Sequence, residues 1–110
     1  MKLLIAGSRG VRDFDLSEYI PKETTLIISG GAKGVDKIAE EYADKHKISK
    51  LILLPDYATY GKFAPLKRNE KMVDLADKVL IIWDGKSKGS LYTKNYATSK
   101  GKDLTVVVCG

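Results

Sequence analysis

Three glycines interrupt the chain between an apolar run and an amphipathic segment. The run 25–29 is followed by Gly30, Gly31 and Gly34, and residues 35–46 then carry apolar side chains at helical spacing. This order predicts a strand, a tight turn and a helix, a junction that lies at the ligand-binding edge of parallel sheets. Because glycine has no Cβ, a ligand phosphate could approach the N–H groups at the helix start. The alternative is a glycine turn that only lets strand and helix pack closely.

An acidic residue, Asp36, stands in the first turn of this predicted helix. A carboxylate there can contact a ribose hydroxyl or act as a general base, but acids also stabilise helix N-termini. We therefore expect Asp36 to combine capping with a ligand contact. Glu40 and Glu41 lie a turn or more beyond the glycines, so we assign them no chemistry. The sequence leaves open whether the protein is an enzyme, and it identifies no catalytic residue.

Other strand ends carry cationic and polar side chains. Arg9 follows the first apolar run, and Arg68 precedes Asn69 at the start of a helical segment. Residues 85–102, after the fourth apolar run, contain no acid. Arginine binds phosphate through two parallel N–H donors. The combination points to a phosphorylated ligand along one edge of the sheet, although lysines in these loops are explained equally well by solvation.

The apolar runs define the elements that must position these side chains. They are continuous rather than alternating, which predicts strands buried on both faces in a parallel sheet with helices on both sides. We expect a single Rossmann-like three-layer α/β/α domain over residues 1–110, with strand order 3-2-1-4-5. The predicted strands are 2–6, 25–29, 50–54, 79–83 and 104–108, and the predicted helices are 13–20, 35–46, 65–76 and 91–99. The last helix is expected to turn Leu91, Tyr92, Asn95 and Tyr96 inward. Residues 56–63 are expected to form a loop.

Composition narrows the class of protein. The 110 residues are 44% apolar and 30% charged with a net charge of +5, which is typical of a globular domain. One cysteine, Cys109, and one histidine, His46, argue against a zinc site and against an internal disulfide. No apolar run is long enough to cross a membrane. We expect a cytoplasmic protein without membrane contact, metal or cofactor.

Several short motifs occur together in a fixed order. They are Gly7-Ser8-Arg9, residues 29–36 (SGGAKGVD), Tyr60-Gly61-Lys62, Arg68-Asn69 and residues 83–90 (WDGKSKGS). Together they resemble the YspA-type branch of the SLOG superfamily, which also includes the DprA/Smf proteins and the LOG phosphoribohydrolases. The resemblance extends over nearly the whole chain. Two departures stand out: Gly89-Ser90 replaces the more usual Gly-Thr but keeps the hydroxyl, and residues 63–65 (FAP) replace an Ala-Gly pair.

The resemblance implies a domain that binds a nucleotide or nucleotide-derived phosphorylated molecule, such as ADP-ribose, NAD or a nucleoside monophosphate, as a sensor or processing module. We expect Gly31 to lie where a ligand phosphate meets the backbone. Carried over by position, the implied ligand contacts are Gly7, Ser8, Arg9, Gly30, Gly31, Gly34, Asp36, Arg68, Asn69, Asp84, Gly89 and Ser90.

Three classes of function remain open. A binding module without efficient chemistry is favoured over a hydrolase of the N-glycosidic or phosphate bond of a nucleotide derivative. Binding of single-stranded DNA, as in the DprA/Smf relatives, is disfavoured because the cations gather at loop ends rather than along a stripe with aromatics. We also expect a homodimer, since a small domain gains core by pairing and superfamily relatives associate.

Overall fold

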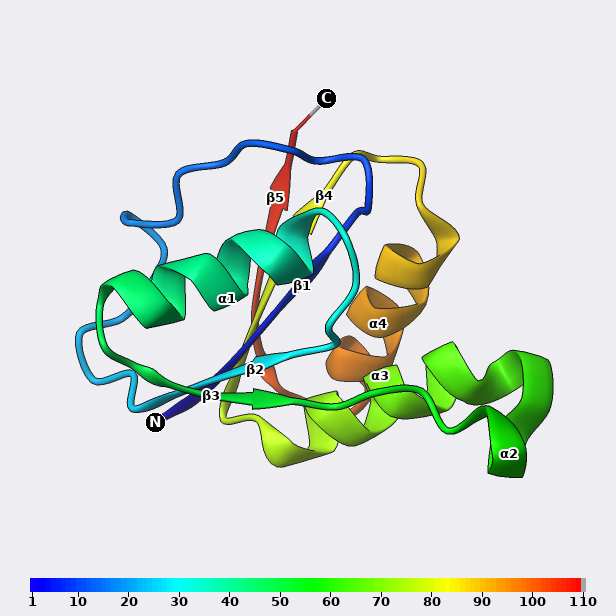
Figure 1. The fold of residues 1–110 in the computed structure, drawn as a ribbon. Coiled ribbons are helices and arrows are strands. Elements are labelled where there is room, and N and C mark those ends of the chain that lie inside the picture. Colours follow the sequence, from blue (N-terminus) through cyan, green and yellow to red (C-terminus); the bar gives the residue numbers. More distant parts are fainter. Residues whose placement is uncertain (110) are drawn as a thin grey trace.

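The computed structural model describes residues 1–109 and contains a parallel sheet with helices on both faces (Figure 1). None of the helices in this range is long and apolar enough to cross a membrane. The strands are β1 (Lys2–Gly7), β2 (Leu26–Ser29), β3 (Ser49–Ile52), β4 (Lys78–Trp83) and β5 (Asp103–Val108); the helices are α1 (Val35–Lys45), α2 (Tyr57–Tyr60), α3 (Ala64–Leu75) and α4 (Lys88–Ser99), with a 3-10 turn, η1 (Gly61–Phe63), between α2 and α3.

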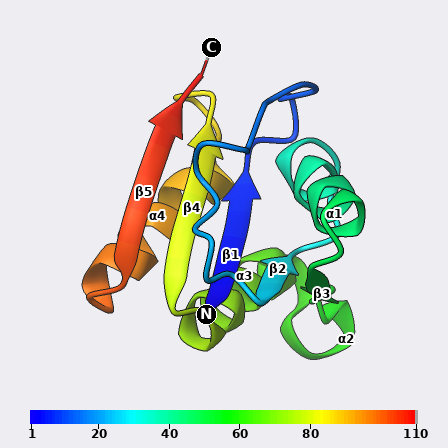
Figure 2. The same cartoon turned by 90° about the vertical axis from the view of Figure 1, so that its left-hand side faces the viewer.

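The strand order is β3-β2-β1-β4-β5 with every neighbouring pair parallel, which confirms the predicted topology. The central strand β1 pairs Leu4 with Ile28 of β2 and with Val79 of β4. Figure 2 shows the arrowheads of β1, β4 and β5 at the same edge of the sheet. Segments that leave the strands there are therefore brought together.

Successive residues of the strands face opposite sides and build two apolar cores. Leu3 and Ile5 pack with Val35, Ala39 and Ala43 of α1 on one side. On the other side, the core joins strand residues to α3 and α4; its fully buried members include Leu4, Ile28, Val73, Ile81 and Ala97. The continuous apolar runs are thus buried on both faces in β1, in β4 except the partly exposed Trp83, and in β2 except the partly exposed Leu26.

Burial on both faces is wrong for β3, whose four residues are all exposed. The cause is its place at the end of the sheet, where only β2 covers it along one side. At the opposite end, β5 is covered only in part: its inner residues are half-buried, and Asp103 and Val108 are exposed. The edges of this sheet are therefore more open than its hydrophobic sequence predicts.

The predicted helix over residues 13–20 is wrong. Local hydrogen bonds replace helical ones: Asp15 Oδ1 accepts the Ser17 N–H at 3.0 Å, and Tyr19 N–H donates to Leu16 O at 2.9 Å. Short polar side chains compete with helix formation in this way. Figure 1 shows the segment crossing beside α1 as an extended loop. Leu16, only 2% exposed, anchors it in the α1-side core.

Two further expectations need correction. The predicted loop 56–63 contains the short α2 and η1, because Asp56 accepts the Thr59 N–H and starts a helical turn. Helix α4 begins at Lys88 and buries Ser90, Thr93 and Ala97, rather than the four predicted residues. Small side chains let this helix approach the sheet, while the hydroxyls of Tyr92 and Tyr96 turn toward α3 and donate to Glu70 and Asp74.

Removing the loop's anchor should lower the free energy of unfolding. Leu16→Ala empties a fully enclosed position in the core, so we expect a loss of about 2–5 kcal/mol in urea denaturation. Glu18→Ala, an exposed change in the same segment, should stay within roughly 0.5 kcal/mol of the wild type. Equal effects of the two substitutions would show that the segment adds nothing to the core.

Candidate functional site

A cavity of about 410 Å³ opens at the carboxyl edge of the sheet. Its volume falls in the range of small-molecule sites, roughly 300–1,000 Å³. The segments after β1, β2 and β4 meet α3 there. The cavity brings together eight of the predicted contacts: Gly7, Arg9, Asp36, Arg68, Asn69, Asp84, Gly89 and Ser90. The other predicted contacts, Ser8, Gly30, Gly31 and Gly34, do not line it.

Sequence reasoning missed the other half of the lining, which consists of Ala6, Gly10, Ala32, Pro65, Leu66, Met72, Ser87 and Thr93. Helical spacing could have found some of them. Pro65 and Met72 lie one turn on either side of Arg68 and Asn69, and Thr93 lies one turn after Gly89. These neighbours give the cavity an apolar wall on α3 and additional hydroxyls on α4.

The glycines outside the lining have structural tasks. Gly34 has φ +76°, and a Cβ on it would lie 2.6 Å from the Arg9 carbonyl oxygen and closer still to that of Ser8. It therefore lets the loop after β1 lie against the start of α1. Gly31 has φ +71°, but its Cβ would point at Ile52 and Leu54, each 3.0 Å away. A Gly31→Val substitution would strain the fold itself, so it cannot isolate a ligand contact.

Gly30 makes room for an arginine and an acid to face the same point. A Cβ on Gly30 would lie 2.8 Å from Arg68 Cζ and 2.9 Å from Asp36 Oδ2. Arg68 Nη1 donates to the carbonyl oxygens of Gly30 at 2.5 Å and Leu53 at 3.2 Å, and its Nε donates to Asn69 Oδ1 at 2.8 Å. Arg68 thus joins α3 to the ends of β2 and β3. Within residues 1–109, no acceptor is bonded to Nη2, which leaves this nitrogen for a ligand.

Asp36 is 7% exposed and lines the cavity. Its Oδ2 accepts the Ala32 N–H at 3.2 Å, so it fixes the glycine loop rather than capping its own helix. Burial raises the pKa of Asp36 above the ordinary 3.8, against the opposing effects of that hydrogen bond and of the charges on Arg68 and Arg9. A carboxyl group in this position can hold a proton at a higher pH than an exposed aspartate.

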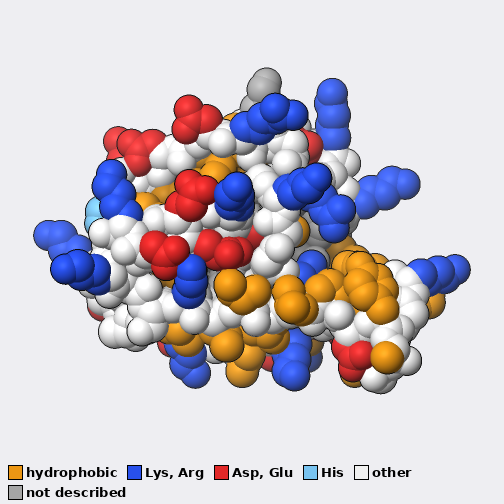
Figure 3. Space-filling view, viewed as in Figure 1, with side chains coloured by type: hydrophobic (Ala, Val, Ile, Leu, Met, Phe, Trp, Pro, Cys, Tyr) orange, Lys and Arg blue, Asp and Glu red, His pale blue; other side chains and the backbone are white. Residues whose placement is uncertain are grey.

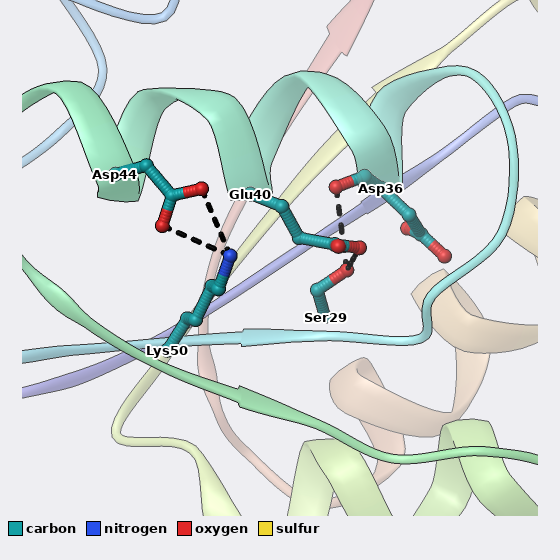
Figure 4. A network of polar contacts seen from close by, with 5 residues as sticks. All are labelled: Ser29, Asp36, Glu40, Asp44 and Lys50. Atoms are coloured by element: carbon teal, nitrogen blue, oxygen red, sulfur yellow. Dashed lines mark hydrogen bonds and ion pairs between the residues drawn. The ribbon is translucent and has the colours of Figure 1, made fainter.

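A second acid, Glu40, supports the same loop through Ser29 (Figure 4). The buried Ser29 Oγ lies 2.9 Å from Glu40 Oε2, to which it can donate, and it accepts the Gly31 N–H at 3.3 Å. Glu40 does not line the cavity. The pair Ser29–Glu40 therefore holds the backbone between Gly30 and Ala32 in place without reaching a ligand.

The loop before α4 is held by short polar side chains. Asp84 Oδ1 accepts the N–H groups of Lys86 and Ser87, both at 2.8 Å, and these bonds lower its pKa. Ser87 Oγ accepts the Ser90 N–H at 3.2 Å and caps the helix. The buried Ser8 hydroxyl accepts the Asp84 N–H at 3.0 Å, which joins the ends of β1 and β4. The first turn of α4, which has no acid, therefore borders the cavity in a fixed position.

The assembled site can recognise an anion and a hydroxyl-bearing group together. Arg9, Arg68 and the N-terminus of α4 favour negative charge, while Asp36 and Asn69 can bond hydroxyls. In residues 1–109 no group of three His, Cys, Asp or Glu side chains is placed to hold a metal ion. Comparisons with protein-family models, with curated proteins and with solved structures found no match to this chain.

The close packing around Gly34 should make a substitution there lower the free energy of unfolding. Gly34→Ala introduces a Cβ against two carbonyl oxygens, so we expect a loss of roughly 3 kcal/mol or more in unfolding free energy. Gly101 also has a positive φ, +67°, but open space around it. Gly101→Ala should cost only about 1 kcal/mol, from the backbone conformation alone. Similar losses for both variants would mean that the contact between the loop and α1 is not tight.

Asp36 should make stability depend on pH. The unfolded chain titrates near the ordinary 3.8 and the folded chain above it, so the native state is penalised only where Asp36 is ionised. Wild-type stability relative to Asp36→Asn should therefore fall as pH rises from 3.8 through the folded pKa, and the two proteins should converge at lower pH. Denaturant titrations across this interval measure the difference. A variant that becomes less stable than wild type as pH rises would show that ionised Asp36 stabilises the fold.

Proposed function

We propose that the protein binds a nucleotide-derived phosphorylated ligand in the cavity at the carboxyl edge of its sheet. The observation that supports this most directly is one cavity in which Arg9, Arg68 and the start of α4 meet the buried carboxyl of Asp36. The two arginines and the start of α4 would bind a phosphate, and the carboxyl group of Asp36 would accept a hydrogen bond from a sugar hydroxyl. The resemblance to the SLOG superfamily points to the same class of ligand.

The phosphate would lie between the two arginines and the N-terminus of α4. Arg9 is exposed and able to close over a ligand, whereas Arg68 is half-buried and fixed by its bonds to main-chain carbonyls. At the helix start, the N–H groups of the first turn lack intrahelical acceptors and carry the positive end of the dipole. The Ser90 N–H is bonded to Ser87 Oγ, so the phosphate would meet the N–H groups before it. Gly89 has no side chain to obstruct this approach, and a Cβ there would meet nothing within 4 Å.

The rest of a mononucleotide has complementary surfaces nearby. Asp36 and the Asn69 amide would bond ribose hydroxyls, while Pro65, Leu66 and Met72 form an apolar wall for a base or sugar. The charged side chains of the lining are two arginines and two aspartates, Asp36 and Asp84. Such a balance favours a ligand with one phosphate or a diphosphate bridge over the concentrated charge of a triphosphate or of DNA.

A hydrolase acting on the same ligands is the second candidate, favoured by the burial of Asp36 beside Arg68. A carboxyl with a raised pKa can protonate a leaving group, and an adjacent guanidinium can stabilise developing negative charge. Incubation with NAD, ADP-ribose and nucleoside monophosphates, followed by chromatography, distinguishes the candidates. Unchanged ligand supports a binding module; products that disappear in Asp36→Asn support the hydrolase.

Removing the free arginine should weaken binding without disturbing the fold. We expect Arg9→Ala to raise the dissociation constant of ADP-ribose or a nucleoside monophosphate by roughly 10- to 150-fold, corresponding to ~1.5–3 kcal/mol for a hydrogen bond to a charged group. Arg12→Ala is the matched control, since Arg12 is exposed in the same loop but does not line the cavity. Titration calorimetry measures both. Equal affinities of the two variants would remove Arg9 from the site.

The proposal also orders the ligands. ADP-ribose should bind more tightly than a fluorescent single-stranded oligonucleotide at physiological salt, because the cations surround one concavity rather than a track for a backbone. Fluorescence anisotropy with ADP-ribose as competitor gives the order directly. Tighter binding of the oligonucleotide, with a steep dependence on salt, would support the DNA-binding alternative instead.

A further inference from the structure

Exposed apolar side chains concentrate along one edge of the molecule. Six of the nine large exposed hydrophobic residues fall between positions 51 and 63, although this stretch is little more than a tenth of the described chain. Figure 3 shows hydrophobic side chains gathered along β3 and toward α2. We call this surface the β3–α2 edge; its apolar residues are Leu51, Ile52, Leu54, Tyr57, Tyr60 and Phe63. Patches of this kind mark interaction sites.

The outer side of β3 also offers unpaired backbone groups. Leu53 N–H donates to Ser29 O of β2 at 2.9 Å. Because N–H directions alternate along a strand, the Leu51 N–H points the same way and those of Lys50 and Ile52 point away from the sheet. No strand of the described chain lies on that side. The edge is therefore a template for an additional strand.

The usual protection of such an edge is missing here. Sheet edges are commonly guarded by a lysine that stands off the strand. Lys50 is the only charged residue of β3, but its Nζ is drawn onto Asp44 of α1 at 2.9 Å (Figure 4). Farther along the edge, the Asp56 carboxylate is turned to Thr59 N–H and Oγ1. The β3 part of the surface is left apolar with its one charge paired, while at the far end Lys62 Nζ lies 5.3 Å from the centroid of the Phe63 ring.

We propose that the β3–α2 edge is the interface with a second copy of this chain, in which the two β3 strands pair antiparallel across a two-fold axis. Such a contact is self-complementary: where a residue of one copy meets a second residue of the other, the same two positions meet again on the far side of the axis. The outward N–H and C=O groups of each strand bond those of the other. The two five-stranded sheets join into one continuous sheet.

The size and composition of the surface fit this partner. Tyr57, Tyr60 and Phe63 are 60%, 46% and 55% exposed, so the three rings alone offer about 300 Å² at the area typical of aromatic side chains. Leu51, Ile52, Leu54 and the surrounding polar rim extend the surface toward the ~800 Å² per partner of a stable interface. Enrichment in aromatics and depletion of charge at the centre are features of such interfaces.

Sedimentation velocity across micromolar concentrations tests the proposal. The wild type should sediment with twice the 12.1 kDa of one chain. The double variant Leu54→Lys, Tyr57→Lys changes side chains that are 70% and 60% exposed, so it should stay folded by circular dichroism and sediment as a monomer. Val108→Lys, a matched change at 65% exposure on the opposite edge strand, should remain a dimer. A monomeric wild type, a dimeric double variant or a monomeric Val108→Lys protein overturns the proposal.

A pair of variants at Lys50 tests the strand pairing itself. Lys50→Pro removes an outward N–H while leaving the ladder to β2 intact, whereas Lys50→Ala removes the ion pair to Asp44 and keeps the N–H. We expect the alanine variant to remain a dimer and the proline variant to sediment as a folded monomer. Dimers of equal stability from both variants would mean that the copies do not meet through β3.

Discussion

The hydrogen bonds of one guanidinium hold together the part of the molecule where ligand recognition is proposed. Arg68 reaches from α3 to the carbonyl oxygens of Gly30 and Leu53, so it fixes the ends of two neighbouring strands relative to a helix. The contact requires that residue 30 have no Cβ, since the guanidinium carbon and the Asp36 carboxylate both approach that point within 3 Å. A glycine, an arginine and an aspartate thus depend on one another for their positions.

This arrangement divides the work between the two arginines of the cavity. Arg68 donates hydrogen bonds to three acceptors within the protein, so its positive charge has a fixed position in the lining of the cavity. Arg9 is exposed on the loop after β1 and is free to respond to a ligand. Burial disfavours the ionised form of Asp36, while the charge of Arg68 favours it. The proposed ligand would change the balance between these two effects by bonding the carboxyl group.

The sequence predicts the sheet better than its surroundings. Strand order follows from continuous apolar runs separated by helical segments, and eight predicted contacts share the cavity because strand ends of a parallel sheet meet at one edge. The prediction of a helix at 13–20 was wrong because local hydrogen bonds of polar side chains replace helical ones: Asp15 Oδ1 accepts the Ser17 N–H. Hydrophobic periodicity predicted the wrong buried face for α4. The buried residues are Ser90, Thr93 and Ala97, and small or polar side chains of this kind do not stand out from exposed ones by hydrophobicity. Gly31 and Gly34 are needed because side chains or carbonyl groups from distant parts of the sequence pack against them, and the local sequence does not reveal such neighbours.

Amide chemical-shift mapping by NMR during titration with ADP-ribose tests the central claim most directly, because it locates the ligand without a substitution. The proposed site requires saturable shifts at Arg9, Ala32, Gly89 and Ser90, which border the cavity from three different segments. Saturable shifts confined to residues outside this lining, or no shifts up to the solubility limit of ADP-ribose, would contradict a nucleotide-derivative site at the carboxyl edge of the sheet.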